Sequence, residues 1–371
     1  MTINNENNKI NVPNLRFPEF QGEWEKCKLG DACNVLMCKR ILASQTNTEG
    51  GVPFYKIGTI GGTPDSYISK ELFDDYKAKY NYPHKGEVMI TCAGTVGKCV
   101  IYDGKDAYYQ DSNIVWIDNP SQNINNGFLY HFLANVDWRK LNSTTIIRIY
   151  NDDLRNLKLN YPQIEEQKKI SHLLSLLDER IATQNKIIGK LQSLIKGIAQ
   201  KIVRSNKPNV RLTECMECKS STLQESEVCE QGTYPVYGAN GIVGYLDNYN
   251  TEGEAIYIIK DGSGVGTVSY VTGKCSATGT LNTLQTKEGY SLQYLYYLLK
   301  VFNFEPYKTG MAIPHIYFKD YGKVKVFCPS YTEQLQYARL LSAIESKLSI
   351  EKNILTSLSL QKQYLLRQMF I

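Results

Sequence analysis

The sequence predicts an α+β protein with two similar β-rich domains separated by two long helices, and two observations support this prediction. A long amphipathic segment at residues 162–203 returns at residues 329–370, at a constant offset of 167 residues. Each copy follows a block of short strand-like runs broken by Gly, Asn and Asp, as expected for β-rich domains. The chain is therefore expected to be an internal repeat with pseudo-two-fold symmetry.

Both long segments have the heptad spacing of a coiled coil, with apolar residues at alternating steps of four and three. These residues are Ile170, Leu174, Leu177, Ile181, Ile188, Leu191, Ile195 and Ile198, and then Leu341, Ile344, Leu348, Leu355, Leu358 and Leu365. Gln184 interrupts the first stripe and Glu351 interrupts the second at the same offset. At ~1.5 Å per residue each helix would extend for roughly 60 Å, which requires a partner. We expect the two helices to form an antiparallel coiled coil with these residues at its seam, although another protein could also be a partner.

The start of the second long helix is signalled by a capping box. Pro329 precedes Ser330, and Glu333 follows three residues later, so the serine and the glutamate can satisfy the first free amide groups of the helix. The first copy has Gln163 in place of the serine.

The two β-rich blocks share landmarks in the same order. Pro53-Phe54-Tyr55 corresponds to Pro235-Val236-Tyr237, and a short helix is expected at Phe128–Leu133 and again at Leu292–Leu299. The intervals between landmarks vary, as in a shared scaffold with variable loops. We expect five segments: a partly disordered arm at 1–23, a first domain at 24–160, a central helix at 161–204, a second domain at 205–327 and a C-terminal helix at 328–371.

Composition narrows the class of protein. With 42% hydrophobic residues and no apolar run of ~20 residues, the chain should be a cytoplasmic protein without a membrane partner. Its ten cysteines are scattered along the chain, so reduced thiols are expected. A net charge of +5 permits nucleic acid as a partner without requiring it.

Catalytic and metal-binding motifs are weak. A glycine-rich run at 261–266 follows an apolar strand, but β-branched and aromatic residues continue after it, so a hairpin turn is favoured over a cofactor loop. The chain could itself be a methyltransferase, but it contains no Asn-Pro-Pro-Tyr or Asp-Pro-Pro-Tyr motif to position an amino group for methyl transfer. No catalytic residue is therefore expected. Cys215 and Cys218 have the spacing of half a zinc site without a second pair, so no metal is expected.

Three features together carry a resemblance to a known family. They are the run VPNLRFP at 12–18 leading to Gly22-Glu23-Trp24, the run YPVYGANGI at 234–242 followed by Gly244-Tyr245, and a proline followed by Glu-Gln before each long helix. In their order, duplication and spacing they make residues 14–371 resemble the DNA specificity subunit of type I restriction-modification systems.

This resemblance implies a function and a set of partners. Each domain would be a target-recognition domain that reads one half of a split double-stranded DNA sequence, and the helices would hold the two domains apart. The subunit would be non-catalytic and would bind no cofactor itself. Two methylation subunits would supply S-adenosylmethionine for adenine methylation, and two restriction subunits would supply ATP- and Mg-dependent activity.

The candidate DNA-binding residues are chosen by chemistry, because Arg and Lys suit guanine, Asn and Gln suit adenine, and many donors suit phosphate. In the first domain they are Lys39, Arg40, Lys56, Thr91, Thr95, Lys98, Gln110, Ser112, Asn113, Arg148 and Tyr150. In the second they are Tyr237, Gly238, Asn240, Lys260, Ser263, Thr280, Asn282, His315 and Tyr317. Because the domains differ, an asymmetric bipartite site is expected. A scaffold that binds protein or carbohydrate remains the alternative.

Overall fold

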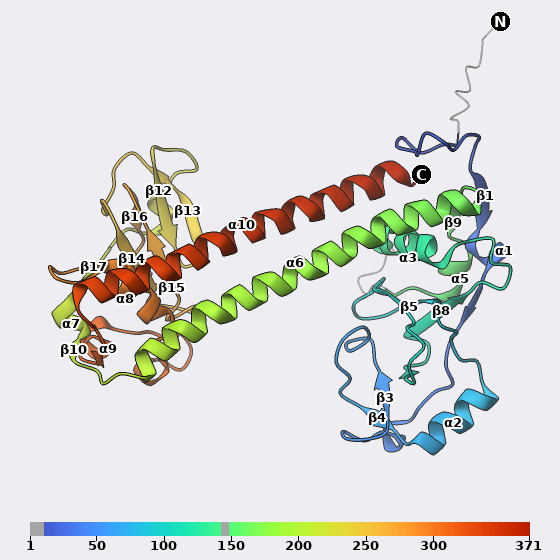
Figure 1. Ribbon diagram of the computed structural model, residues 1–371, viewed down its shortest axis with the longest axis horizontal. Helices are drawn as coiled ribbons and strands as arrows, with labels where there is room; N and C mark the ends of the chain where they lie inside the picture. Colours follow the sequence, from blue (N-terminus) through green and yellow to red (C-terminus); the bar gives the residue numbers. More distant parts are fainter. Residues whose placement is uncertain (1–10, 142–147) are drawn as a thin grey trace, which may run out of the picture. The chain divides into compact units, whose positions relative to one another are not determined.

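The computed structural model describes residues 11–141 and 148–371 (Figure 1). The chain divides into two compact units, of which the first comprises Met1–Thr183 with Leu355–Ile371 and the second comprises Gln184–Ile354. Both boundaries fall inside a long helix, so each unit contains one β-rich domain and a part of both helices. A compact unit is therefore not a single segment of the sequence, because it combines one domain with portions of two helices that are far apart in the chain.

The two long helices are α6 (Ile164–Arg204) and α10 (Tyr331–Met369). Within unit 1 they run antiparallel, because Asn160 beside the start of α6 donates to the Ile371 carbonyl at 3.1 Å while Asp178 meets Lys362 at 2.5 Å. The capping box predicted for the second helix is confirmed, since the Glu333 amide donates to Ser330 Oγ and the Ser330 amide donates to the glutamate carboxylate at 3.2 Å.

The apolar stripes of both helices face inward in their units. None of the predicted seam residues is exposed. The fully buried ones are Ile170, Leu174, Leu177, Ile188, Ile195, Leu341 and Leu348. The half-buried ones are Ile181, Leu191, Ile198, Ile344, Leu355, Leu358 and Leu365. Tertiary packing of this kind, rather than intrinsic helix propensity, supplies most of the stability of a long helix.

Unit 1 contains a four-stranded antiparallel sheet, a three-stranded sheet in which β3 and β7 are parallel, and one separate strand pair. The four-stranded sheet has the order β2 (Asn34–Leu36), β8 (Ile114–Asp118), β5 (Val88–Thr91) and β6 (Cys99–Ile101). The three-stranded sheet has the order β4 (Tyr67–Ile68), β3 (Val52–Tyr55) and β7 (Tyr108–Tyr109). The separate pair consists of β1 (Glu25–Lys28) and β9 (Lys158–Tyr161). The helices are α1 (Leu29–Ala32), α2 (Lys70–Lys79), α3 (Asn126–Asn135), α4 (Trp138–Leu141) and α5 (Asn151–Arg155), with a 3₁₀ turn at Ala43–Gln45.

Unit 2 repeats this topology. Its four-stranded sheet has the order β11 (Met216–Ser220), β17 (Leu281–Thr286), β14 (Ala255–Ile259) and β15 (Val268–Val271). Its three-stranded sheet has the order β13 (Gly241–Leu246), β12 (Tyr234–Gly238) and β16 (Ser276–Ala277). A separate pair is formed by β10 (Val210–Arg211) and β18 (Lys325–Val326). The helices are α7 (Leu212–Cys215), α8 (Leu292–Lys300) and α9 (Phe318–Tyr321), with 3₁₀ turns at Glu225–Glu227 and Glu305–Tyr307. The α+β class and the internal repeat are thereby confirmed.

Local predictions also hold in the two domains. The short helices expected at Phe128–Leu133 and Leu292–Leu299 are α3 and α8. The glycine-rich run at 261–266 connects the antiparallel strands β14 and β15, so it is a hairpin turn and not the start of a helix that would hold a cofactor.

A buried glutamine fastens each long helix to its domain. In unit 1 the Gln167 side-chain oxygen accepts from the Asn125 amide at 2.7 Å, and in unit 2 the Gln334 oxygen accepts from the Ser291 amide at 2.9 Å. Each glutamine also donates to the carbonyl of the proline five residues before it. Asn125 and Ser291 are the N-cap residues of α3 and α8, so one contact orients the long helix and the domain helix together.

The N-terminal segment is tied to the helix ends of unit 1. Residues 1–10 of the expected arm lie outside the described residues, but Arg16 forms two charge-assisted hydrogen bonds with the fully buried Glu166, at 2.7 and 2.8 Å. The Leu15 amide donates to the Gln368 carbonyl at 2.9 Å. Residues 11–23 are therefore part of the packed structure of unit 1 and connect its portions of α6 and α10.

The core of unit 1 runs from the sheet into the long helices. Trp24 packs edge-on against Phe128, and Phe128 stacks on Phe370, which follows α10. Ile170 and Leu174 of α6 belong to the same apolar cluster. The domain and its helix segments thus share one core. Among the described residues, no helix is both long enough and apolar enough to cross a membrane.

Candidate nucleic-acid interface

In unit 1, three loops meet at the end of β5. The Cys92 amide donates to the Asn113 carbonyl at 2.8 Å, and the Ile149 amide donates to the Cys92 carbonyl at 2.9 Å. These backbone bonds bring together the β5–β6 turn, the loop before β8 and the segment before α5. The candidates Thr95, Asn113, Arg148 and Tyr150 are therefore neighbours although they are far apart in the sequence.

The loop after β3 joins the same edge. Lys98 Nζ donates to the Ile60 carbonyl at 2.5 Å, and Gln110 Oε1 accepts from the Ile57 amide at 3.4 Å. A Cβ on Gly94 would lie 2.7 Å from the Ile57 side chain, so the glycine turn and this loop are in close contact. Lys98 and Gln110 thus hold the edge together with part of their hydrogen-bonding capacity.

Unit 2 forms an equivalent edge with different side chains. The Lys260 amide donates to the Thr280 carbonyl at 3.0 Å, and the Ile316 amide donates to the Lys260 carbonyl at 2.9 Å. The same pattern of backbone bonds makes Lys260 the counterpart of Cys92, Thr280 the counterpart of Asn113, and His315 the counterpart of Arg148. Tyr237 reaches this edge as well, because its carbonyl accepts from the Thr278 amide at 2.9 Å.

Each edge presents an exposed tyrosine beside a cation. Tyr150 is 61% exposed and lies 5.8 Å from the Arg148 guanidinium, while Tyr317 is 46% exposed and lies 5.3 Å from the Lys319 amine. An exposed ring with a cation over its face offers an apolar surface and a positive charge to one ligand. Nucleic acid has both complementary groups, in its bases and its phosphates.

Other candidates of unit 1 are engaged with neighbouring side chains. Arg40 lies 3.4 Å from Asp111, and Lys56 lies 2.9 Å from Asp65. Lys56 lowers the pKa of the Asp65 carboxyl. The Lys39 amine lies 5.2 Å from the Tyr80 ring, and Ser112 has a positive φ of 50° in the loop before β8. These contacts are solvent-exposed, so the basic groups can exchange them for phosphates at little cost.

Three candidates must be corrected, because the structure buries them. Thr91 and Asn282 are 0% and 3% exposed, and Gly238 is also buried. The Thr91 hydroxyl donates to the Thr95 carbonyl and accepts from the Lys98 amide, so it stabilises the turn. The Asn282 amide donates to the Tyr321 hydroxyl at 3.4 Å. A residue enclosed in this way supports the edge and does not contact a ligand directly.

The remaining candidates, Asn240, Ser263 and His315, differ in how firmly they are held. Asn240 is exposed in the β12–β13 turn. His315 is fixed, because its Nδ1 lies 2.7 Å from an oxygen of Asp261. Ser263 lies in the turn between β14 and β15, close to this pair in sequence.

The sequence also failed to indicate two exposed apolar side chains near this edge. Met311 and Ile313 are 105% and 57% exposed. Direct readout of base edges uses polar and basic side chains, and neither methionine nor isoleucine belongs to these classes. The local sequence shows two apolar residues in a segment bounded by glycine and proline, and this pattern does not tell an exposed loop from a buried turn.

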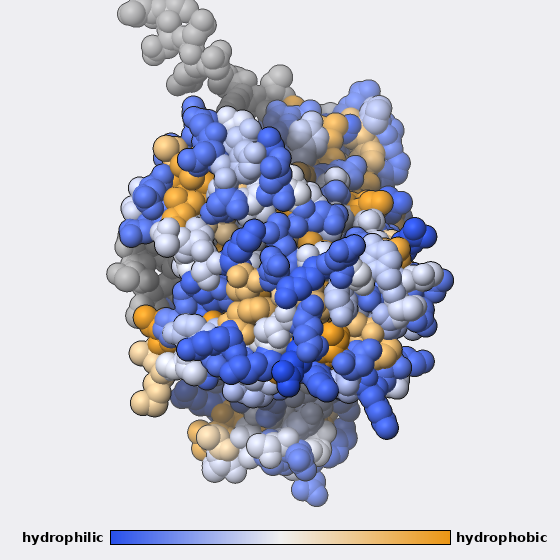
Figure 2. Space-filling model, turned by 90° about the vertical axis from the view of Figure 1, so that its left-hand side faces the viewer, coloured by the Kyte–Doolittle hydropathy of each residue, from blue (hydrophilic) through white to orange (hydrophobic). Residues whose placement is uncertain are grey.

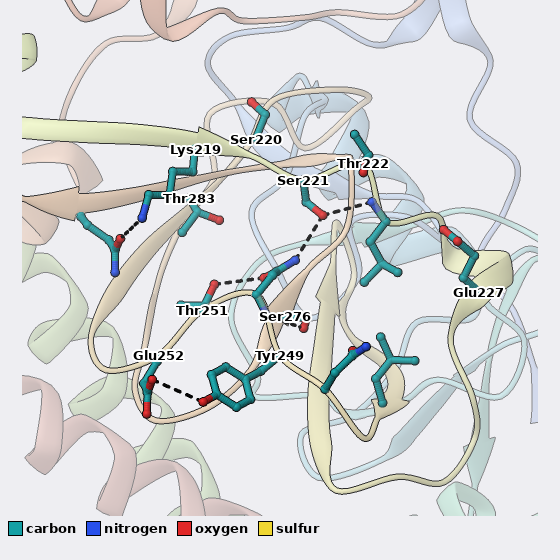
Figure 3. Close-up of a pocket in the computed structure, with 15 residues that line it drawn as sticks. Lys219, Ser220, Ser221, Thr222, Glu227, Tyr249, Thr251, Glu252, Ser276 and Thr283 are labelled. Atoms are coloured by element: carbon teal, nitrogen blue, oxygen red, sulfur yellow. Dashed lines mark hydrogen bonds between the residues drawn. The ribbon is translucent and has the colours of Figure 1, made fainter.

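Unit 2 also has a polar groove of about 750 Å³ that the sequence did not predict (Figure 3). Its polar groups largely satisfy one another. Asn250 donates to Ser221 at 3.2 Å and to the Ala277 carbonyl at 3.0 Å, and the Tyr249 hydroxyl donates to Glu252 at 3.4 Å. Within residues 11–141 and 148–371 there is no group of three or more His, Cys, Asp or Glu side chains that could hold a metal ion.

The duplicated domains, each with a loop edge that keeps its backbone and changes its side chains, define a two-domain recognition protein. The chain matches the family model for the type I restriction modification DNA specificity domain over residues 21–193 and 205–360, and it belongs to this family. Like other members, it is a non-catalytic subunit.

Curated relatives agree with this assignment. A putative type I restriction enzyme specificity subunit, S.HindORF215P of Haemophilus influenzae, is 49% identical over 160 residues, which span 43% of this chain and 41% of that relative. The putative MjaX specificity subunit of Methanocaldococcus jannaschii is 24% identical over an alignment covering 92% of this chain and 91% of the relative. The crystal structure of a type I system S subunit from M. genitalium has the same fold, with a TM-score of 0.69, 21% identity, and coverage of 97% of this chain and 99% of that one.

Proposed function

We propose that the chain directs a type I restriction-modification complex to an asymmetric bipartite site in double-stranded DNA, with one half-site read by each domain. The observation that carries this proposal is the equivalence of the two loop edges. The two edges have the same pattern of backbone hydrogen bonds, but Asn113 of unit 1 corresponds to Thr280 of unit 2, and Arg148 corresponds to His315. A fixed scaffold with exchanged side chains suits two recognition surfaces with different base preferences.

The reading mechanism follows from the chemistry of these groups. An arginine such as Arg148 can donate two hydrogen bonds to guanine, and an amide such as that of Asn240 can pair with adenine. Lys39, Arg40, Lys56 and Lys260 suit phosphates, because phosphate contacts fix the register without needing a defined base. Tyr150 and Tyr317 supply exposed ring surface on either edge.

In this proposal the two long helices set the separation of the half-sites, near one turn of B-DNA, and bind two methylation subunits. Their outer faces support a docking role, because large apolar side chains on them are exposed to solvent. These residues are Leu176 and Leu194 on α6, and Leu340, Ile350, Ile354, Leu360 and Tyr364 on α10. The duplication of the helix supports two docking sites, and the exposed apolar side chains of the two sites differ.

The proposed complex assigns the chemistry to other subunits. The methylation subunits supply S-adenosylmethionine for transfer to adenine, and two restriction subunits supply ATP- and Mg-dependent activity. One solved structure with a similar fold, at a TM-score of 0.52 and 16% identity, is described as showing complex assembly of a type I restriction-modification system. A multisubunit assembly of this kind is what we propose for the present chain. Action on DNA inside the cell implies a cytoplasmic location.

The test is to express the chain with its methylation partner and to map methylated adenines across a genome. We expect one motif with two unlike half-sites and a fixed spacer. A chain that gives neither a sequence-selective gel shift nor adenine methylation would instead favour a scaffold that binds protein or carbohydrate. Exchanging the first domain for that of a relative should change one half-site and leave the other unaltered.

A further inference from the structure

A short loop next to the edge of unit 2 has a closed and constrained shape. The Thr309 amide donates to the His315 carbonyl at 2.9 Å, and the His315 amide donates to the Thr309 carbonyl at 2.7 Å. Gly310 has a φ of 88°, and a Cβ at this position would lie 2.3 Å from the Ile313 carbonyl oxygen. We call residues 309–315 the finger loop. Its conformation requires glycine at position 310.

The base of the finger loop is braced against the β14–β15 turn. His315 Nδ1 lies 2.7 Å from Asp261 Oδ1, and the Gly262 amide donates to the Pro314 carbonyl at 3.0 Å. The Ile316 amide continues this contact by donating to the Lys260 carbonyl at 2.9 Å. The loop is thus held at its base by a side-chain pair and two backbone hydrogen bonds, and it is attached to the proposed DNA edge.

The tip of the finger loop presents apolar side chains to solvent. Met311 is 105% exposed, Ile313 is 57% exposed, and Ala312 between them is exposed as well. The tip residues 311–313 are Met, Ala and Ile, whose side chains have no hydrogen-bond donor for a phosphate. Figure 2 shows one face of the molecule as mostly hydrophilic with small separate apolar patches. Single exposed apolar side chains are common on protein surfaces, so the inference depends on the brace, which holds two of them together at one tip.

We propose that Met311 and Ile313 form a wedge that enters between adjacent base pairs in the half-site read by the second domain. This inference rests on the proposed DNA-reading function. DNA offers apolar surface at thymine methyl groups and at the faces of stacked bases. Methionine and isoleucine are among the side chains that proteins insert at base steps. Contact with a thymine methyl group does not require a rigid loop. Insertion between stacked bases requires a tip that resists displacement, and the contacts at the base of the finger loop provide this rigidity.

The wedge would also serve the proposed reaction. An enzyme that modifies a base must take it out of the helical stack, and a step already opened by the finger loop lowers the cost of deforming the neighbouring duplex. Asp261 and His315 act as positioning residues in this arrangement, because they hold the loop without being part of its tip.

The experiment uses the full chain with its methylation partner and a duplex carrying the mapped site. 2-Aminopurine, whose fluorescence rises when it is unstacked, replaces one base at a time through the second half-site. We expect a several-fold rise at one step other than the methylated adenine. At protein concentrations that saturate the duplex, the double variant Met311→Ala with Ile313→Ala should lose this rise in the bound DNA, and Met311→Leu with Ile313→Leu should restore it.

Ile101→Ala is the matched control, since this isoleucine is 40% exposed on β6 of unit 1, and it should leave the rise unchanged. The wedge is refuted by the absence of any such rise in the wild type, or by its persistence in the double alanine variant. If uracil in place of thymine weakens binding with no fluorescence change, the tip reads methyl groups and the wedge is also refuted. If the wild-type complex showed no sequence-selective binding at all, the proposed DNA-reading function would be contradicted. Failure of that function can therefore be distinguished from failure of the wedge alone.

Discussion

At the residue scale, Arg148 and His315 show how one position can carry different chemistry. Both precede the isoleucine whose amide closes the loop edge, and their backbones are fixed in the same way. Arginine donates through a planar group that matches guanine, whereas the His315 ring is already paired with Asp261 at 2.7 Å. The two half-sites are therefore proposed to differ at this position, because Arg148 can donate to guanine whereas His315 positions the finger loop.

Replacing Arg148 by alanine should weaken binding of the proposed complex to its site by about 1–3 kcal/mol and relax one position of the first half-site. A gel-shift titration at fixed salt concentration, followed by mapping of the methylated motif, measures both effects. Arg155→Ala is a charge-matched control, because this arginine pairs with Asp152 at 3.5 Å on α5. An unchanged affinity would remove Arg148 from the interface.

His131 makes the stability of unit 1 depend on pH. Burial lowers the pKa of His131 from its ordinary value of 6.5 to about 4; nearby Asp178 opposes this change, and Lys362 adds to it. The ring is 1% exposed, with Nε2 lying 3.4 Å from Ser175 Oγ. Because the unfolded chain holds the proton more tightly, stability is complete above pH 6.5 and falls as the pH approaches 4.

The unfolding free energy of unit 1 should therefore fall by about 2 kcal/mol between roughly pH 7.5 and pH 5 through this group alone. His131→Gln, which cannot titrate, should remove that part of the pH dependence. Urea unfolding followed by tryptophan fluorescence reports on unit 1, since Trp24, Trp116 and Trp138 are the three tryptophans of the chain. Equal pH slopes in wild type and variant would show that the histidine is already charged or accessible in the folded state.

At the scale of elements, the long helices owe their pairing to the apolar stripe and to one polar contact within it. In unit 2, Gln184 Nε2 donates to the Glu351 backbone carbonyl at 2.9 Å and also to its carboxylate. Gln184 is only 8% exposed. A polar residue at one seam position specifies the register of a coiled coil and costs stability, so we interpret this pair as a register device.

Changing Gln184 and Glu351 together to leucine should raise the melting temperature of unit 2 and weaken the preference for one register. Changing Gln184 alone should lower the melting temperature, because Glu351 would stay partly buried without its hydrogen bond from the Gln184 side chain. Thermal melting by far-UV circular dichroism tests both variants. A single change that already raises the melting temperature would rule out a stabilising pair.

At the scale of the whole molecule, the spacing proposal concerns the helices as a continuous element. The last strand of each domain lies directly before its long helix, with β9 ending at Tyr161 and α6 beginning at Ile164. The buried Gln167 then ties the start of α6 to the domain helix. Such a connection leaves no flexible linker between a recognition domain and its helix.

Inserting one heptad into both helices, beside Gln184 and Glu351, should lengthen the spacer of the methylated motif. Seven residues add about 10 Å of helix, which corresponds to roughly 3 base pairs of DNA. Mapping the methylated adenines of the variant complex reads the spacer directly, and both half-sites should stay the same. An insertion in one helix only is the control, since it breaks the seam register. A spacer of unchanged length would mean that the distance is set elsewhere.

The elements and their duplication can be predicted from the sequence alone. The heptad stripe, the capping box at Ser330 and Glu333, and the hairpin at 261–266 depend on residues a few positions apart, and such relations can be read along the chain. Which candidates share a surface depends instead on tertiary contacts. Cys92, Asn113 and Ile149 meet through hydrogen bonds between distant segments, and the same pairing encloses Thr91. Solvent exposure is set by these long-range contacts, so the buried threonine and the exposed Met311 could not be told apart from their local sequence.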